Sequence, residues 1–156
     1  MKVYEFLEKT SENVIICESY FDNIIGFCDG KNGVSYPILN SEIGRISYNS
    51  KANALMLETD FNVYDFLKEN FDRLGDKIID DFINYNDDDA IVKLDIEYLF
   101  SSKGSIFYSI GDNIYNARDF YENIVITNEH YIKRMLEMWS LYEEYLDLND
   151  VDKWGF

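Results

Sequence analysis

The chain has 156 residues, of which 47% are hydrophobic and 17% aromatic, and it carries 30 acidic against 14 basic residues, a formal net charge of −16. A chain of this length can bury its own core, and so apolar a composition excludes an intrinsically disordered protein. The charge disfavours nucleic acid and anionic membranes as direct partners and favours basic ones. We therefore expect a single acidic domain over residues 1–156.

The first elements predicted are a short helix and two strands. Residues 1–9 place Val3, Phe6 and Leu7 at helical spacing. Residues 14–16, 20–21 and 24–27 are rich in β-branched and aromatic side chains, which favour two strands. We expect these two strands to lie on either side of a reversal at residues 22–23.

A turn and three further strands are predicted before residue 60. Residues 29–33 combine Gly and Asn, which tolerate the positive φ angles of tight turns. The following segment, 34–39, is predicted to be a strand. Because Pro37 cannot donate to a ladder, we expect that strand to lie at a sheet edge. Residues 45–48 and 54–58 predict a hairpin.

The longest helical pattern covers about residues 62–84. Its apolar side chains recur at three- and four-residue steps, and acidic residues fall mostly between them. Asn62 is a suitable N-cap, and Asp65 suits the positive first turn. Gly75 lies in the middle of the pattern, where we expect a kink or a division of the helix.

The second half of the chain predicts a hairpin and two helices. Residues 90–100 alternate apolar and polar side chains as a half-buried strand does, and 105–110 follow as its partner. Residues 116–123 suit a short helix, and 128–148 an amphipathic one. The whole pattern predicts an α+β fold, in which a mainly antiparallel sheet of five to seven strands packs against two long amphipathic helices.

Targeting signals and cysteine chemistry are not evident. The first ten residues lack the apolar core of a secretory signal, and no run approaches the ~18 apolar residues that cross a bilayer, so we expect a cytoplasmic protein. Cys17 and Cys28 are too few for a zinc site or a disulfide framework. We expect both to be buried free thiols.

No motif in the sequence identifies a reaction. His130 is the only histidine, which excludes a multi-histidine metal site, and there is no G-x-S-x-G elbow around a serine. The glycines at 26, 30 and 33 match neither a dinucleotide-binding loop nor a phosphate-binding loop. We therefore expect no catalytic residue, cofactor or metal.

Acidic residues concentrate at the end of the first long helix, where residues 76–89 contain six aspartates and one lysine. Tyr85 lies among them, and aromatic rings are enriched at protein-binding hot spots. A second acidic pair falls on the last predicted helix. The predicted partner-binding residues are Asp76, Asp80, Asp81, Tyr85, Asp87, Asp88, Asp89, Glu143 and Glu144.

The sequence thus favours a small inhibitory protein that blocks a basic, nucleic-acid-handling protein by presenting carboxylates in place of phosphates. An immunity protein for a toxic nuclease fits this description, and so does a phage-encoded inhibitor of a bacterial defence nuclease, such as an anti-CRISPR protein. Two alternatives remain open. One is a metal-dependent hydrolase whose site combines scattered acids with His130, and the other is a non-catalytic chaperone or scaffold domain.

Overall fold

The computed structural model describes residues 1–29, 34–138, 142, 145–148 and 150, and it has the predicted α+β class. The described residues form seven strands, but these belong to two sheets of four and three strands rather than to one. The chain divides into two compact units, Met1–Val63 with Met135–Phe156 and Tyr64–Arg134, which we call unit 1 and unit 2. The expectation of a single domain stays a prediction.

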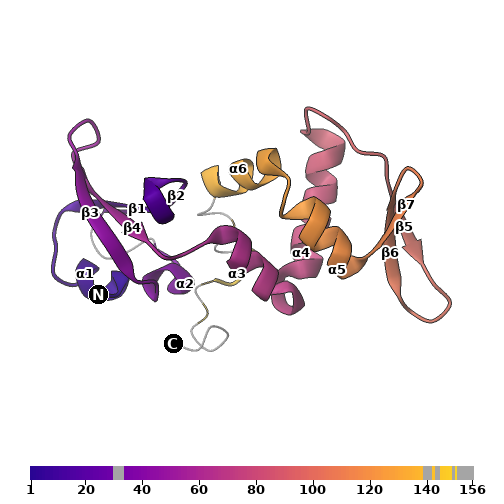
Figure 1. The fold of residues 1–156 in the computed structure, drawn as a ribbon, viewed down its shortest axis with the longest axis horizontal. Helices are drawn as coiled ribbons and strands as arrows, with labels where there is room; N and C mark the ends of the chain where they lie inside the picture. Colours follow the sequence, from indigo (N-terminus) through magenta and orange to yellow (C-terminus); the bar gives the residue numbers. More distant parts are fainter. Residues whose placement is uncertain (30–33, 139–141, 143–144, 149, 151–156) are drawn as a thin grey trace. The chain divides into compact units, whose positions relative to one another are not determined.

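Unit 1 is built on a four-stranded sheet (Figure 1). Its strands β1 (Asn13–Cys17), β2 (Ile24–Asp29), β3 (Ile43–Asn49) and β4 (Ala54–Thr59) lie in the order β2-β1-β4-β3. The central pair, β1 and β4, is parallel, whereas the two outer pairs are antiparallel. The continuous apolar run of β1 suits this central place, because Val14, Ile15, Ile16 and Cys17 are all buried.

Short helices accompany this sheet: α1 (Val3–Leu7), α2 (Tyr36–Leu39) and the 3₁₀ turn η1 (Ser19–Phe21). The prediction of a strand at 34–39 is wrong. Pro37 lies in the first turn of α2. A backbone N–H at this position has no acceptor within the helix, so proline loses no hydrogen bond there, and its fixed φ angle suits the helix. The other strands and the first helix predicted for this half are confirmed, except that Tyr20 and Phe21 belong to η1 rather than to a strand. The predicted turn includes residues 30–33, which lie outside the described residues.

The long helix predicted for 62–84 is two helices, α3 (Val63–Glu69) and α4 (Phe71–Asp88). The division falls at Asn70, whose φ of −105° and ψ of 26° are not helical, and whose side-chain amide donates to the carbonyl of Phe66. It does not fall at Gly75, which is buried inside α4. α4 also continues past the predicted end at residue 84.

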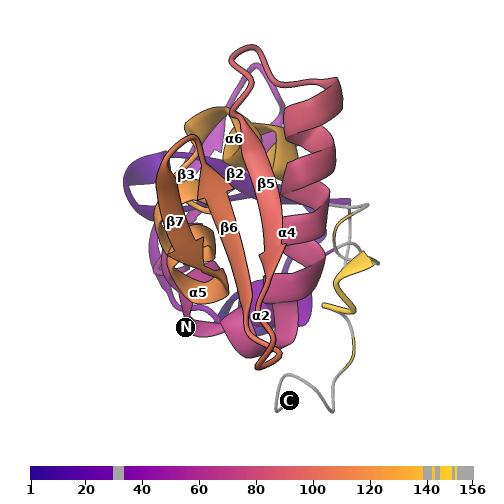
Figure 2. The same cartoon turned by 90° about the vertical axis from the view of Figure 1, so that its right-hand side faces the viewer.

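The three-stranded sheet of unit 2 comprises β5 (Ile96–Phe100), β6 (Ile106–Ile110) and β7 (Asn113–Asn116) in that order, with antiparallel pairing throughout (Figure 2). The predicted strand at 90–100 is shorter than expected, since pairing begins at Ile96. β7 was not predicted; the chain reverses into it at Gly111, which has a φ of 58°.

The remaining helices are α5 (Ala117–Phe120), which continues into the π turn η2 (Tyr121–Val125), and α6 (Glu129–Glu137). Asn128 precedes α6 and is its N-cap, as predicted. Its Oδ1 accepts a hydrogen bond of 3.0 Å from the backbone amide of Tyr131. α6 ends at Glu137, whereas the prediction extended to 148, and much of the difference lies outside the described residues. None of the described helices is both long and apolar enough to cross a membrane.

Aromatic rings make up much of the core of unit 2. Phe82 of α4 meets the ring of Tyr131 edge-on at 5.2 Å and that of Phe120 at 6.1 Å, and all three side chains are fully buried. Such edge-to-face contacts add to the stability that burial itself gives. Tyr131 therefore serves core packing, as Phe82 and Phe120 do.

Candidate functional site

A row of carboxylates follows the exposed face of α4. The opposite face buries Leu74, Ile78 and Phe82, so residues half a turn away face outward. Four aspartates share this outward face, and we call them the acidic stripe: Asp72, Asp76, Asp80 and Asp87. The first three recur every four residues, a rise of about 6 Å between neighbours along the helix. The stripe therefore extends over most of α4.

Few ion pairs neutralise the acidic stripe. Arg118 approaches Asp72 at 3.5 Å, but both side chains are largely exposed, and such pairs contribute little. Asp76, Asp80 and Asp87 form no ion pair with any other described residue. These three carboxylates are open to a cationic ligand.

Asp81 has a different role from the acidic stripe. It is half-buried, and its Oδ2 accepts a hydrogen bond of 2.7 Å from the hydroxyl of Tyr131. The Tyr131 ring is fully buried and packs 5.3 Å from the ring of Tyr85. Asp81 therefore fixes a core tyrosine, and we place it among the structural residues.

The C-terminal end of α4 is closed by Arg134. Its guanidinium pairs with Asp89 at 2.9 Å and lies over the Tyr85 ring, 5.3 Å from the centroid. Carboxylates at this negative end of a helix dipole are unfavourable, and a cation there offsets them. Lys93 acts in the same direction, since its ammonium donates to the backbone carbonyl of Asp87.

The predicted binding residues thus divide into four groups. Asp76, Asp80, Asp87 and Asp88 are exposed, whereas Asp81 and Asp89 are hydrogen-bonded or ion-paired within unit 2. Tyr85 is buried, so the structure does not place its ring on the surface. Glu143 and Glu144 lie outside the described residues.

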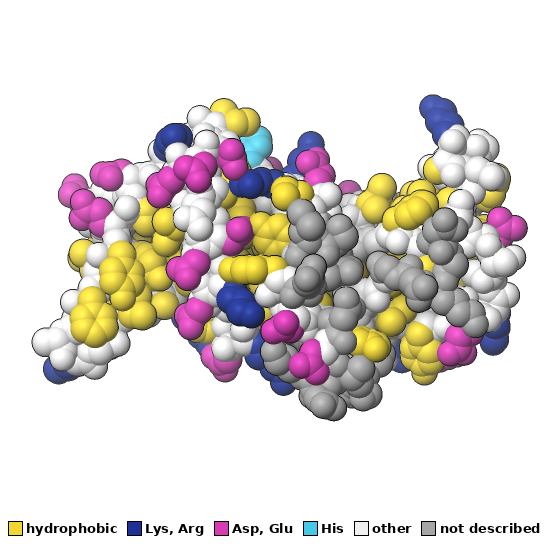
Figure 3. All heavy atoms as spheres, turned by 180° about the vertical axis from the view of Figure 1, so that it is seen from behind, with side chains coloured by type: hydrophobic (Ala, Val, Ile, Leu, Met, Phe, Trp, Pro, Cys, Tyr) yellow, Lys and Arg dark blue, Asp and Glu magenta, His cyan; other side chains and the backbone are white. Residues whose placement is uncertain are grey.

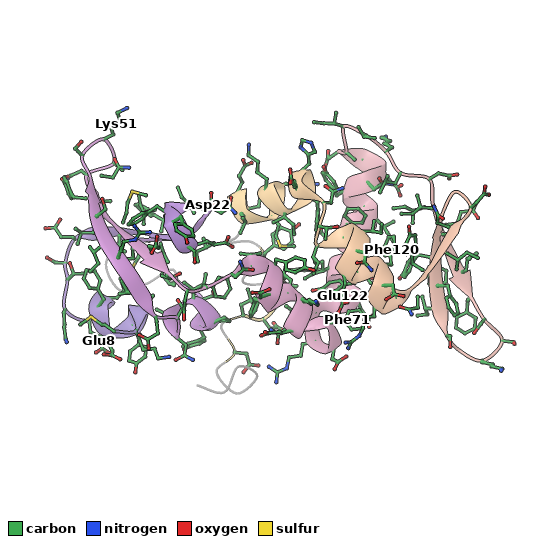
Figure 4. All side chains as sticks on the ribbon, in the orientation of Figure 1. Glu8, Asp22, Lys51, Phe71, Phe120 and Glu122 are labelled. Atoms are coloured by element: carbon green, nitrogen blue, oxygen red, sulfur yellow. The ribbon has the colours of Figure 1, made fainter. Side chains whose placement is uncertain are left out.

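A second feature, which the sequence reasoning missed, is the apolar face of the three-stranded sheet. The register pairs Tyr98 with Tyr108, and Tyr108 with Tyr115, so these side chains share a face. Tyr108 stacks on Phe120 at 4.5 Å with a 16° angle between the rings, and Phe120 extends from α5 toward the sheet (Figure 4). Only part of the face is covered in this way, because Phe100 stays 66% exposed.

This apolar face borders the acidic stripe. Burial raises the pKa of Tyr108, and the charges of Asp80, Tyr98 and Asp76 raise it further. Figure 3 shows the same neighbourhood from behind: a yellow apolar area over the three-stranded sheet lies beside a column of magenta acidic side chains over α4. Charge and apolar area therefore meet on one surface of unit 2.

His130 and the two cysteines are further residues whose side chains could take part in catalytic or metal chemistry. His130 is exposed in the first turn of α6. No three His, Cys, Asp or Glu side chains in the described part of the chain converge as metal ligands. Cys17 and Cys28 are both buried, as predicted, and burial raises the pKa of Cys17. The hydrolase alternative stays a prediction.

Comparisons of the chain with protein-family models, with curated proteins and with solved structures found no match.

Proposed function

We propose that this protein is a non-catalytic inhibitor that binds a basic, nucleic-acid-handling protein through the acidic stripe of α4. The observation that carries the proposal is the row of exposed carboxylates along one rigid helix, three of them without an ion pair in the described residues. A preformed row of charge attracts a basic groove without first having to order itself.

The spacing of the stripe supports a partner that normally binds phosphates. Asp72, Asp76 and Asp80 are each separated from the next by a rise of about 6 Å along α4. One DNA strand carries a charge about every 3.4 Å of its axis. The stripe thus offers roughly half the linear charge of a single strand, enough to engage several Lys or Arg side chains in a groove built for a backbone. An immunity protein that blocks a toxic nuclease and a phage protein that blocks a defence nuclease could both act by placing this row of carboxylates in the nuclease's basic groove.

Affinity capture with matched variants tests the proposal. The bait is the full chain, either unchanged or as Asp76→Asn/Asp80→Asn/Asp87→Asn. A control with the same change of charge is Glu8→Gln/Glu12→Gln/Asp22→Asn, at exposed positions of unit 1. We expect the unchanged protein and the control to retain a basic protein that elutes with rising salt, and the stripe variant to lose most of it.

The recovered protein is then assayed for its own nucleic-acid activity with and without the inhibitor. Recovery of the same partner by the stripe variant, or binding indifferent to salt, would contradict the charge-based mechanism. An unchanged partner activity at saturating inhibitor would contradict inhibition while leaving binding intact.

A further inference from the structure

The apolar face of the three-stranded sheet carries a patch that nothing in the described part of unit 2 covers. Tyr98, Phe100 and Ile106 lie on this face by register and are 59%, 66% and 36% exposed. Phe100 and Ile106 are direct cross-strand partners, so their side chains adjoin. We call these three residues the sheet patch. Adjoining exposed apolar side chains of this size mark sites of interaction.

The sheet patch is held on a rigid hairpin. β5 and β6 pair over five consecutive residues each, and the turn between them is closed by hydrogen bonds. The amide of Ser101 donates to the carbonyl of Ser105, and the amide of Gly104 to the carbonyl of Ser101. Tyr98 of the patch packs edge-on against Tyr108, which itself stacks on Phe120. A ligand would therefore meet a preformed surface, with little ordering needed.

Charge decides what kind of ligand suits the patch. The acidic side chains of α4 lie beside this apolar face (Figure 3), and Asp76 and Asp80 are exposed members of that row. Nucleic-acid bases would stack on the rings, but their phosphates would be repelled by these carboxylates. A second copy of the chain would bring two acidic stripes together, which is also unfavourable. A cationic segment with apolar side chains satisfies both halves of the surface.

We propose that the sheet patch binds an apolar or aromatic side chain of a protein segment whose adjacent Lys or Arg residues pair with Asp76 and Asp80. This inference rests on the proposed function, because it assumes a basic partner, and it adds what that partner must contain. The acidic stripe attracts the segment from a distance, whereas the sheet patch distinguishes one basic segment from another.

Two synthetic peptides of equal length and charge test this inference. One alternates Arg with Trp, and the other alternates Arg with Ala; each carries a fluorophore, and binding to the full chain is followed by anisotropy. At about 0.15 M salt we expect the Arg–Trp peptide to bind about tenfold more tightly, because only it buries rings on the patch.

Variants of the chain test whether the preference for the Arg–Trp peptide depends on the sheet patch. Phe100→Ser should reduce the tenfold preference to less than about threefold. Ile114→Ser is the matched control: Ile114 is also 66% exposed, but it lies on the opposite face of the same sheet, opposite Ser109. It should leave the preference unchanged. Asp76→Asn/Asp80→Asn should weaken both peptides together. Circular dichroism of each variant establishes that it is folded.

The outcomes separate the two proposals. Equal binding of both peptides, or an equal effect of Phe100→Ser and Ile114→Ser, overturns the sheet patch as a binding site and leaves the acidic stripe in place. Binding of neither peptide at low salt overturns the proposed function as well. Self-association of the free protein in sedimentation that Phe100→Ser abolishes assigns the patch to a second copy, and also overturns the inference.

Discussion

The side chain of Asn86 exchanges two hydrogen bonds with the backbone of Leu94. Its Nδ2 donates to the Leu94 carbonyl at 2.9 Å, and its Oδ1 accepts from the Leu94 amide at 2.8 Å. Asn86 is buried in α4 and so fixes the connection from α4 to β5. Because Asn86→Ala leaves both Leu94 groups without these partners, we expect it to lower the free energy of unfolding by about 2 kcal/mol, measured by urea denaturation.

Asn84→Ala provides the control for this prediction. Asn84 is exposed on the same helix, and alanine is the better helix former, so the change should stay within about 0.5 kcal/mol. Equal stability of the Asn86→Ala and Asn84→Ala variants would show that the hydrogen bonds to Leu94 contribute nothing.

A side chain at Gly75 would collide with Phe71. A Cβ added to Gly75 would lie 2.6 Å from Cδ1 of the Phe71 ring. That ring is held from two other sides, by Tyr121 at 5.1 Å and by the guanidinium of Arg118 at 5.0 Å. Helix propensity alone predicts that Gly75→Ala stabilises the protein by about 1 kcal/mol, but we expect destabilisation, because the Phe71 ring must move.

A double-mutant cycle identifies the collision as the cause. In a Phe71→Ala background the ring is absent, and Gly75→Ala should then become neutral or stabilising. Thermal or urea unfolding of the four proteins measures this difference. A stabilising Gly75→Ala in the unchanged background would contradict the packing described here.

Tyr121 should make the stability of the protein sensitive to alkaline pH. Its hydroxyl donates to the carbonyl of Leu67 at 2.6 Å, and burial, with a smaller effect of the Glu122 charge, raises its pKa well above the ordinary tyrosine value. Because the pKa of Tyr121 is higher in the folded protein than in the unfolded chain, its contribution to the free energy of unfolding is complete below about pH 10. This contribution is lost as the pH rises further, since the Tyr121 hydroxyl then ionises readily only in the unfolded chain.

We expect Tyr121→Phe to lower the free energy of unfolding by about 1–2 kcal/mol at pH 7. The variant should also lose less stability than the unchanged protein between about pH 9 and pH 11. Tyr98→Phe, at an exposed position, should match the unchanged protein in both respects. Parallel pH profiles for all three proteins would refute the assignment to Tyr121.

The part of the site that the sequence could predict is the part that depends on one helix. The spacing of Asp72, Asp76 and Asp80 implies a shared face in any α-helix, whatever surrounds it. The roles of Asp81 and Tyr85 could not be predicted, because Tyr131 is distant in the sequence and meets both only in the folded unit. A carboxylate that fixes a core ring has no local signature.

The strands show the same limit. Residues 90–95 alternate like a strand, yet Ile91 and Val92 are 82% and 76% exposed, so burial does not cause the pattern. The alternation of Tyr98 and Phe100 does follow the sheet, but the sequence could not show that Phe120 covers only part of that face. Which apolar residues remain exposed depends on tertiary contacts rather than on periodicity.

Protonation of Glu58 should destabilise a strained turn in unit 1. Tyr20 and Phe21 both have positive φ angles, 62° and 53°, which residues other than glycine rarely adopt. The Glu58 carboxylate accepts from Nε and Nη2 of Arg45 at 3.1 and 2.8 Å. This interaction with Arg45 lowers the pKa of Glu58, and the backbone amides of Tyr20 and Phe21 lower it further, so we expect Glu58 to hold the turn.

Because the pKa of Glu58 is lower in the folded protein than in the unfolded chain, its carboxylate stabilises the turn above the ordinary glutamate pKa. This stabilisation is lost as the pH falls through the lowered pKa of the folded protein. We expect hydrogen-exchange protection of the Tyr20 and Phe21 amides to fall between about pH 5 and pH 3, before the sheet unfolds. Glu58→Gln should show reduced protection already at pH 5, whereas Glu8→Gln should behave as the unchanged protein. Protection that is insensitive to both pH and Glu58→Gln would mean that Glu58 does not hold the turn, and the strain would then need another source of support in unit 1.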